Sequence, residues 1–273
     1  MKRSSVSANI SGLVAILFIG FPVYWMVTTS FKPKGDILSI HPTLFPHSFS
    51  LQNYVQAITK QGFGKAFLNS LIVVSCTVVI SIVLALFAAI AVARMKFKGK
   101  NIFIASILLV QMIPLSALLI PLYLLLSRLH LTDTLGGLVL TYVAFILPFI
   151  VWVLRGFLAN IPLELEEAAL VDGCTKPQAY RYVLFPLMAP GLVATSIFAF
   201  VQAWNEFLLA YIVLSSSNKA TMPVWLGAFT SRYGTDWGPL MASSVLTAIP
   251  VVIFFLIIQD RIAVGVTAGA VKG

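Results

Sequence analysis

The chain has 273 residues, of which 59% are hydrophobic and only 10% are charged, whereas a soluble domain carries about 25% charged residues. This composition, with a mean hydropathy of +0.98, excludes water as the solvent for most of the surface. The net charge of +9 does not indicate nucleic-acid binding, because that function needs a basic face on a soluble domain and the sequence contains none.

Apolar segments of roughly 20 residues or more, the length that crosses a bilayer core, recur along the whole chain. They are continuous runs, not alternating ten-residue strands, so they predict helices and exclude a β-barrel. The sequence therefore predicts an all-α, polytopic membrane protein that forms one domain over residues 1–273. The six expected spans are residues 10–31, 67–93, 101–127, 136–158, 186–214 and 241–263.

Basic residues predict the orientation of these spans, because loops on the cytoplasmic side carry an excess of lysine and arginine. With a cytoplasmic N-terminus, the inner segments hold eleven of the eighteen basic residues, and both termini face the cytoplasm. The first span is longer than the 7–15 apolar residues of a signal peptide and is expected to be retained. The inner basic residues are Lys2, Arg3, Arg94, Lys96, Lys98, Lys100, Arg155, Lys176, Arg181, Arg261 and Lys272.

The third span contains Gln111 near its expected midpoint, together with Pro114 and Pro121. Each proline removes a backbone donor and is expected to bend the helix. A bent helix beside a polar side chain is typical of the wall of a polar cavity. The alternative is that Gln111 only bonds a neighbouring helix and that the prolines shape the packing.

An acidic loop, residues 159–185, is expected between the fourth and fifth spans on the cytoplasmic side. It is much longer than the 2–8 residues that usually connect bundle helices. Asn160 is expected to cap a short helix, and three glutamates follow where the positive end of a helix favours acids. Asp172 and Gly173 are expected to end that helix, and Thr175 to start a second one.

Two short helices at an angle would project from the membrane as a compact knob. Ala168 and Ala169 are expected to leave one flank of it bare, so that another protein surface can approach the backbone closely. The alternative is a pair of interfacial helices lying on the lipid headgroups. Three glutamates beside an anionic leaflet argue against that alternative.

Glu206 lies inside the fifth expected span, where an ionisable group costs several kcal/mol unless it faces protein or water. Functional placement is the default for such a residue. Amide and aromatic side chains surround it, and sugars are usually held by such planar polar groups and flat rings. The candidate pathway residues are therefore Gln111, Gln202, Trp204, Asn205 and Glu206. The alternative is that Glu206 pairs with a base on a neighbouring helix and fixes the packing.

The acidic loop carries a resemblance to a known family. Glu167-Ala168-Ala169, then Asp172-Gly173, then Phe185-Pro186-Leu187 with Pro190 beyond, resembles the "EAA" loop of permease subunits of binding-protein-dependent ABC importers. Residues 265–273 and 203–214 resemble the carbohydrate-uptake branch of that family, specifically subunits like the maltose permease G protein. The similarity extends over nearly the whole chain, including residues 49–54 and 68–70.

The resemblance implies the fold of a type I ABC importer permease, with the acidic loop as a coupling element. In this family the short helix of the loop docks on a cytoplasmic ATPase subunit, so that ATP-driven closure moves the membrane helices. The C-terminal Gly269, Val271 and Lys272 would then reach toward the ATPases, or else form a frayed tail. The implied ATPase-coupling residues are Glu166, Glu167, Ala168, Ala169, Asp172, Gly173 and Pro186.

The resemblance also implies the partners and the location of the chain. The partners are a second homologous permease, two ATPase subunits, an extracytoplasmic binding protein, membrane lipid and a sugar, with no nucleic acid. A di- or oligosaccharide is the expected substrate, with a glycerophosphate-type ligand as the alternative. The location is the plasma membrane of a bacterium or archaeon.

The chain is not expected to hydrolyse ATP itself. No G-x-x-x-x-G-K-[ST] motif occurs, since Gly64-Lys65 is followed by Ala66 and Gly99-Lys100 by Asn101. We therefore expect no catalytic residue, metal or cofactor in this chain, with ATP and Mg²⁺ bound by the partner ATPases. An ion-coupled secondary transporter or channel that works alone is the main alternative, and a membrane-embedded enzyme is a second.

Overall fold

The computed structural model describes residues 2–59, 62–232 and 234–270. In these residues five helices are long and apolar enough to cross a membrane, or six if one bent pair counts as a single span. The all-α, multi-span prediction is therefore confirmed. The chain divides into two compact units, residues 1–64 with 224–251 and residues 65–223 with 252–273.

The first unit contains α1 (Lys2–Ser30), α2 (Lys34–Ile37), α3 (Gln52–Thr59) and the beginning of α13 (Trp237–Ala270). A two-residue antiparallel pair, β1 (Thr230–Ser231) with β2 (Gly234–Thr235), precedes α13.

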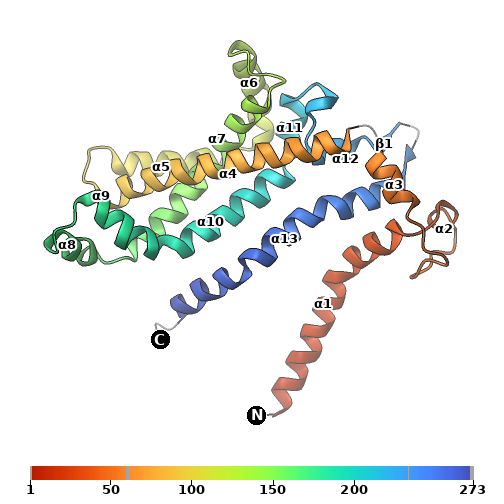
Figure 1. Cartoon of the computed structure of the whole chain (residues 1–273), viewed down its shortest axis with the longest axis horizontal. Coiled ribbons are helices and arrows are strands. Elements are labelled where there is room, and N and C mark those ends of the chain that lie inside the picture. Colours follow the sequence, from red (N-terminus) through yellow and green to blue (C-terminus); the bar gives the residue numbers. More distant parts are fainter. Residues whose placement is uncertain (1, 60–61, 233, 271–273) are drawn as a thin grey trace. The chain divides into compact units, whose positions relative to one another are not determined.

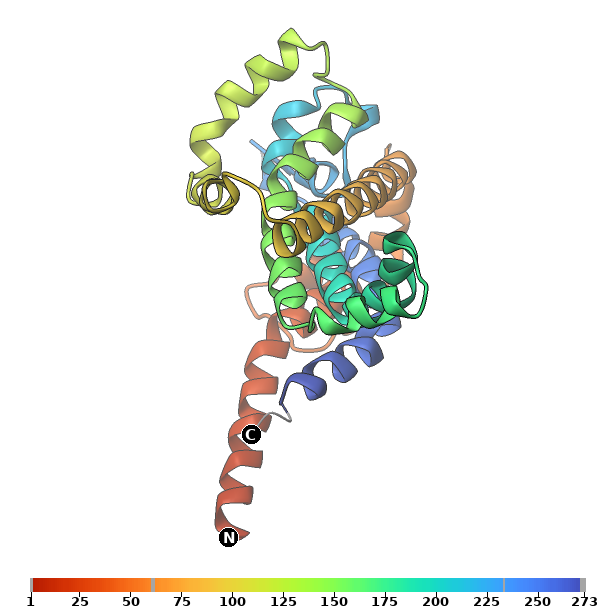
Figure 2. The same cartoon turned by 90° about the vertical axis from the view of Figure 1, so that its left-hand side faces the viewer.

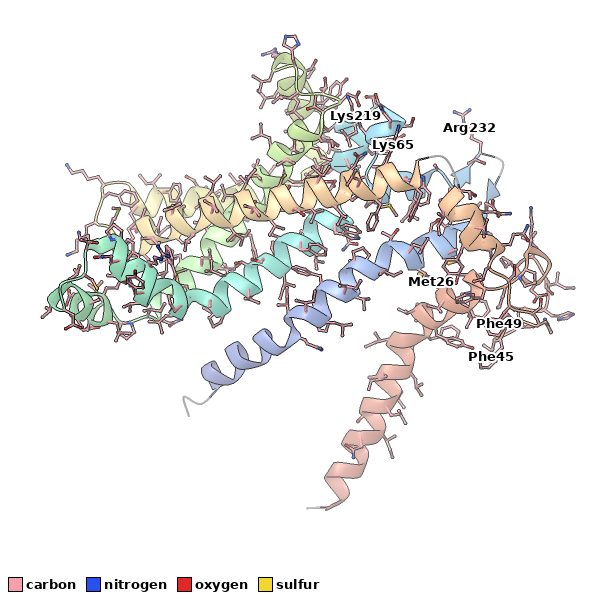
Figure 3. All side chains as sticks on the ribbon, viewed as in Figure 1. Met26, Phe45, Phe49, Lys65, Lys219 and Arg232 are labelled. Carbon is pink, nitrogen blue, oxygen red and sulfur yellow. The ribbon has the colours of Figure 1, made fainter. Side chains whose placement is uncertain are left out.

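Polar bonds hold the end of α1 against α3. The buried amide of Asn53 donates hydrogen bonds to the backbone oxygens of Ser30 at 3.0 Å and Lys32 at 2.8 Å. Figure 3 shows Phe45 and Phe49 beside Met26, near the end of α1. The end of α1 therefore contacts both α3 and the loop that precedes α3.

The second unit contains most of the remaining helices (Figure 1). α7 packs against both α10 and α5. The approach of α7 to α10 requires Gly191, because a Cβ atom there would lie 2.7 Å from the Phe157 ring. The elements are α4 (Phe63–Arg94), α5 (Lys100–Gln111), α6 (Leu115–Arg128), α7 (Leu135–Ala159), α8 (Glu164–Val171), α9 (Lys176–Ala179), η1 (Tyr180–Leu184), α10 (Phe185–Asn205), α11 (Leu208–Val213) and η2 (Ser217–Lys219). α12 (Met222–Gly227) begins in this unit, and its residues from 224 onward belong to the first.

Two expected spans differ from the structure. The third span is broken into α5 and α6, which meet at 103°; Figure 2 looks along α5, with α6 rising from its end. Pro114 caps α6 at this break, whereas Pro121 lies inside α6 without interrupting it. The fifth span, expected at residues 186–214, is instead a continuous helical run from Lys176 to Asn205.

A polar clamp joins the α6–α7 loop to the segment after α11. Asp133 has a positive φ of 53°, and its N–H donates to the Val213 oxygen at 2.7 Å. Its carboxylate accepts hydrogen bonds from the Ser216 hydroxyl at 2.5 Å and the Ser216 N–H at 2.9 Å, and pairs with Lys219 at 3.0 Å. The Ser216 bonds are the main cause that lowers the pKa of Asp133. Figure 3 places Lys219 near Lys65, at the beginning of α4.

Candidate functional site

The acidic loop folds as two short helices followed by a turn of π-helix (Figure 1). α8 begins at Glu164 and carries three glutamates in its first turn, where the helix dipole favours negative charge. The prediction that Asn160 caps this helix is wrong. Asn160 is instead the C-cap residue of α7, and its side-chain amide donates to the Gly156 oxygen at 3.1 Å.

The predicted end of α8 and restart of the chain are both confirmed. Asp172 is the C-cap residue, and Gly173 has a φ of +91°, which favours glycine because it has no Cβ. The Thr175 N–H then donates to Gln178 Oε1 at 2.7 Å, and the Thr175 hydroxyl donates to the same oxygen at 2.8 Å. These bonds begin α9 at Lys176.

Glu166 is not an exposed residue of this loop. Its side chain is 8% exposed and accepts a hydrogen bond from Arg94 Nε at 2.6 Å. Arg94 Nη2 donates to the Ile161 oxygen at 2.9 Å, so one guanidinium holds α8 and the chain that enters it. Removing one partner of a buried ion pair costs about 3–5 kcal/mol, because the other charge stays buried and unpaired.

The free surface of the acidic loop is therefore narrower than the sequence predicts. Ala169 is only 8% exposed, so the expectation that it leaves a bare flank is wrong, and only Ala168 of the two alanines is open. Pro186 is exposed and lies in the first turn of α10. The exposed candidate residues of the loop itself are Glu167, Ala168, Asp172 and Gly173.

A cleft of about 400 Å³ lies in the second unit, bordered by the α5–α6 break, α7, α10 and the beginning of α11. It has the size and the mixed polar and aromatic lining of a small-molecule site. Its polar side chains are Gln111, Tyr142, Gln202 and Glu206, and its aromatic rings include Phe145, Phe149 and Phe198. Three of the five predicted pathway residues thus come together at one cleft.

Glu206 lies at the break between α10 and α11. Its carboxylate accepts hydrogen bonds from the N–H groups of Leu209 at 2.9 Å and Ala210 at 3.0 Å, and from the Tyr142 hydroxyl at 3.0 Å. Over the described residues, no basic side chain forms an ion pair with it. The alternative, in which Glu206 pairs with a base on a neighbouring helix, is therefore wrong for the described residues. Glu206 bonds backbone N–H groups and a tyrosine instead.

Two other predicted pathway residues lie elsewhere. Trp204 is 1% exposed and stacks on Phe200, with ring centroids 5.7 Å apart, so it belongs to the core and not to the cleft. The Asn205 amide bonds the Val201 oxygen at 2.9 Å on its own helix, and Asn205 does not line the cleft. Gln111 does line it, and its amide lies 3.4 Å from the Phe145 oxygen.

Sequence reasoning missed two important side chains, Tyr142 and Arg94. Tyr142 lies within a largely apolar span, and a polar tip in such a span is the signal that points to it. For Arg94 the sequence predicts only a role in membrane orientation. Its partner Glu166 is 72 residues away, a separation that no local pattern reveals.

The C-terminal candidates are only partly described. Gly269 lies in the last turn of α13, which ends at Ala270. Val271 and Lys272 lie outside the described residues.

Comparison with known proteins identifies the family. Residues 81–267 match the family described as "binding-protein-dependent transport system inner membrane component". The diacetylchitobiose uptake system permease protein DasC of Streptomyces coelicolor is 45% identical, with 100% of both chains covered. The trehalose transport system permease protein SugB of Mycobacterium tuberculosis is 38% identical, with 94% of this chain and 95% of SugB covered.

The fold is shared with a solved structure of a bacterial ABC transporter involved in the import of alginate. That chain is 21% identical, has a TM-score of 0.82, and matches over 94% of this chain and 95% of its own length. On the family match and the two relatives, the chain belongs to the inner-membrane components of binding-protein-dependent transport systems, and is a multi-pass permease of the ABC transporter class.

Proposed function

We propose that the chain forms half of the translocation pathway of an ATP-driven importer for a di- or oligosaccharide. The observation that carries this proposal is the 45% identity over the full length to a permease named for diacetylchitobiose uptake. A second relative named for trehalose transport supports the same substrate class.

The cleft supports a sugar as the cargo. It combines the flat rings of Phe145, Phe149 and Phe198 with the amides of Gln111 and Gln202. Flat apolar rings and a few fixed polar groups are what a pocket needs to orient a small polar ligand. In this proposal Glu206 both borders the pathway and fixes the break between α10 and α11.

The exposed surface of the acidic loop is the proposed ATPase contact. Glu167, Ala168, Asp172 and Gly173 would meet one of two cytoplasmic ATPase subunits, which bind ATP and Mg²⁺. The buried Glu166 and Ala169 would hold that surface in place. The C-terminal segment around Gly269, Val271 and Lys272 is a second proposed contact with the ATPases.

The remaining partners follow from the same proposal. A second homologous permease supplies the other half of the pathway, and an extracytoplasmic binding protein delivers the sugar. The basic residues at Lys96, Lys98 and Lys100 support an orientation with both termini in the cytoplasm. A relative of the same fold has been solved with a periplasmic protein that holds an alginate pentasaccharide.

Reconstitution tests this function. The purified chain, alone or assembled with its second permease and ATPase subunits, is placed in liposomes, and uptake of labelled disaccharides is measured with binding protein present. We expect uptake only in the complete assembly with ATP. Uptake by the chain alone under an ion gradient would instead establish a secondary transporter.

A further inference from the structure

The buried ion pair between Arg94 and Glu166 joins two parts of the chain that lie 72 residues apart in the sequence. Arg94 is the last residue of α4 and Glu166 lies in the first turn of α8. Both side chains are largely buried, with exposures of 11% and 8%. The pair therefore fastens the acidic loop to one end of a 32-residue helix.

The bonding geometry is specific to arginine. Nε binds Glu166 Oε1 while Nη2 binds the Ile161 oxygen, and these two acceptors flank the beginning of α8. A lysine has one compact ammonium on a flexible stem and does not present a rigid fork to two such acceptors. Arg94 thus fixes the position of α8 as well as balancing a buried charge.

The opposite end of α4 is also fixed by polar bonds. The Asn69 amide donates to the oxygens of Asn218 at 3.0 Å and Ala220 at 3.1 Å. The Met222 N–H donates to the buried Ser70 hydroxyl at 2.7 Å. About 36 Å of helix separates Ser70 from Arg94, at 1.5 Å per residue. α4 is therefore attached to the acidic loop at one end and to residues 218–222 at the other.

We propose that Arg94 is a positioning residue for coupling, which holds α8 to α4 through Glu166 so that a force on the acidic loop is carried along α4. This inference rests on the proposed ATPase contact of the loop. It separates two roles within the acidic loop. The exposed residues make the contact with the ATPase, and the buried Glu166 transmits the movement.

The test uses the full reconstituted complex with binding protein and sugar. The test variants are Arg94→Gln, Glu166→Gln and the double exchange of Arg94→Glu with Glu166→Arg. The control is Arg155→Gln on α7, which also removes one basic charge. Copurification measures ATPase association, and the number of ATP molecules hydrolysed per sugar imported measures coupling. We expect both single variants to bind the ATPases but to need about tenfold more ATP per sugar.

The exchange should recover part of the lost coupling, because it restores opposite charges but not the Arg94 bond to the Ile161 oxygen. Arg155→Gln should behave as the unmodified chain does. Arg94→Lys should be intermediate, because it keeps the charge but loses the two-acceptor geometry. Unchanged coupling in both single variants would overturn the inference, and so would an exchange variant that assembles normally without recovery.

Two further outcomes separate this inference from the proposed function. If the unmodified chain binds no ATPase, the proposed function fails and the inference fails with it. If the glutamine variants do not accumulate in the membrane, Arg94→Lys decides the question. Normal coupling in that variant would overturn the positioning role.

Discussion

The acidic loop and the cleft are both candidate sites in the second unit, but they are held in different ways. The loop depends on local caps and on one ion pair that spans 72 residues. The cleft depends on Glu206, which bonds two nearby N–H groups and one tyrosine on α7. The loop is thus held by a contact between residues far apart in the sequence, whereas Glu206 is held mainly by backbone groups a few residues away.

The largest expected effect comes from Gly173, compared with Gly99 in the α4–α5 turn. Both glycines have φ near +90° (91° and 89°), and a Cβ at either would meet nothing within 4 Å. Valine at either position therefore introduces similar backbone strain. We expect Gly173→Val to reduce ATPase copurification by about tenfold or more, a loss of roughly 1.4 kcal/mol, and Gly99→Val to leave it unchanged.

Equal losses in the two valine variants would mean that the effect is general destabilisation and not loss of a contact. Normal copurification in both would remove Gly173 from the proposed ATPase contact.

The next effect concerns Glu206 in the cleft. Glu206→Ala should destabilise the chain by about 1 kcal/mol, because the N–H groups of Leu209 and Ala210 and the Tyr142 hydroxyl all lose their acceptor, but these part-buried bonds border the cleft and water can replace them. Glu206→Gln keeps one acceptor oxygen and should assemble while lowering sugar uptake. Thermal unfolding in detergent and uptake in proteoliposomes measure the two effects.

Asn205→Ala is the matched control for Glu206, because Asn205 is the adjacent residue and bonds only within its own helix. It should change neither measurement strongly. If Glu206→Gln fails to assemble, the residue serves packing and the pathway role is excluded.

The smallest effect is expected at the Asp133 clamp. The pKa of Asp133 is lowered in the folded chain, chiefly by the Ser216 hydrogen bonds. Its stabilising contribution is therefore complete above the unfolded pKa of about 3.9 and is lost as the pH falls through the folded value. Asp133→Asn should lower the Tm at pH 7, and the difference from the unmodified chain should shrink below about pH 4. A Tm difference independent of pH would show that the carboxylate charge is not what holds the clamp.

Local patterns in the sequence predicted the parts of the structure that local forces decide. Hydropathy predicted the multi-span helical class, because a backbone in lipid must satisfy its own hydrogen bonds. Asp172 and Gly173 predicted the end of α8, because glycine favours the positive φ that this turn adopts. The cost of polar groups in apolar spans also singles out Gln111, Gln202 and Glu206, and these three line one cleft.

Tertiary packing decided the rest. Ala168 and Ala169 are identical in type and adjacent, yet only Ala169 is buried, because the face that α8 turns inward depends on what it packs against. Trp204 was expected beside the pathway and lies in the core for the same reason.

The sequence by itself determined that this is a membrane-spanning helical permease with an acidic, glycine-terminated loop between two spans. Only the tertiary structure decided that Glu166 faces Arg94 and that Glu206 faces Tyr142. The physical reason is that hydropathy, caps and turns act over a few residues, whereas a buried ion pair or a cleft needs groups brought together from distant helices.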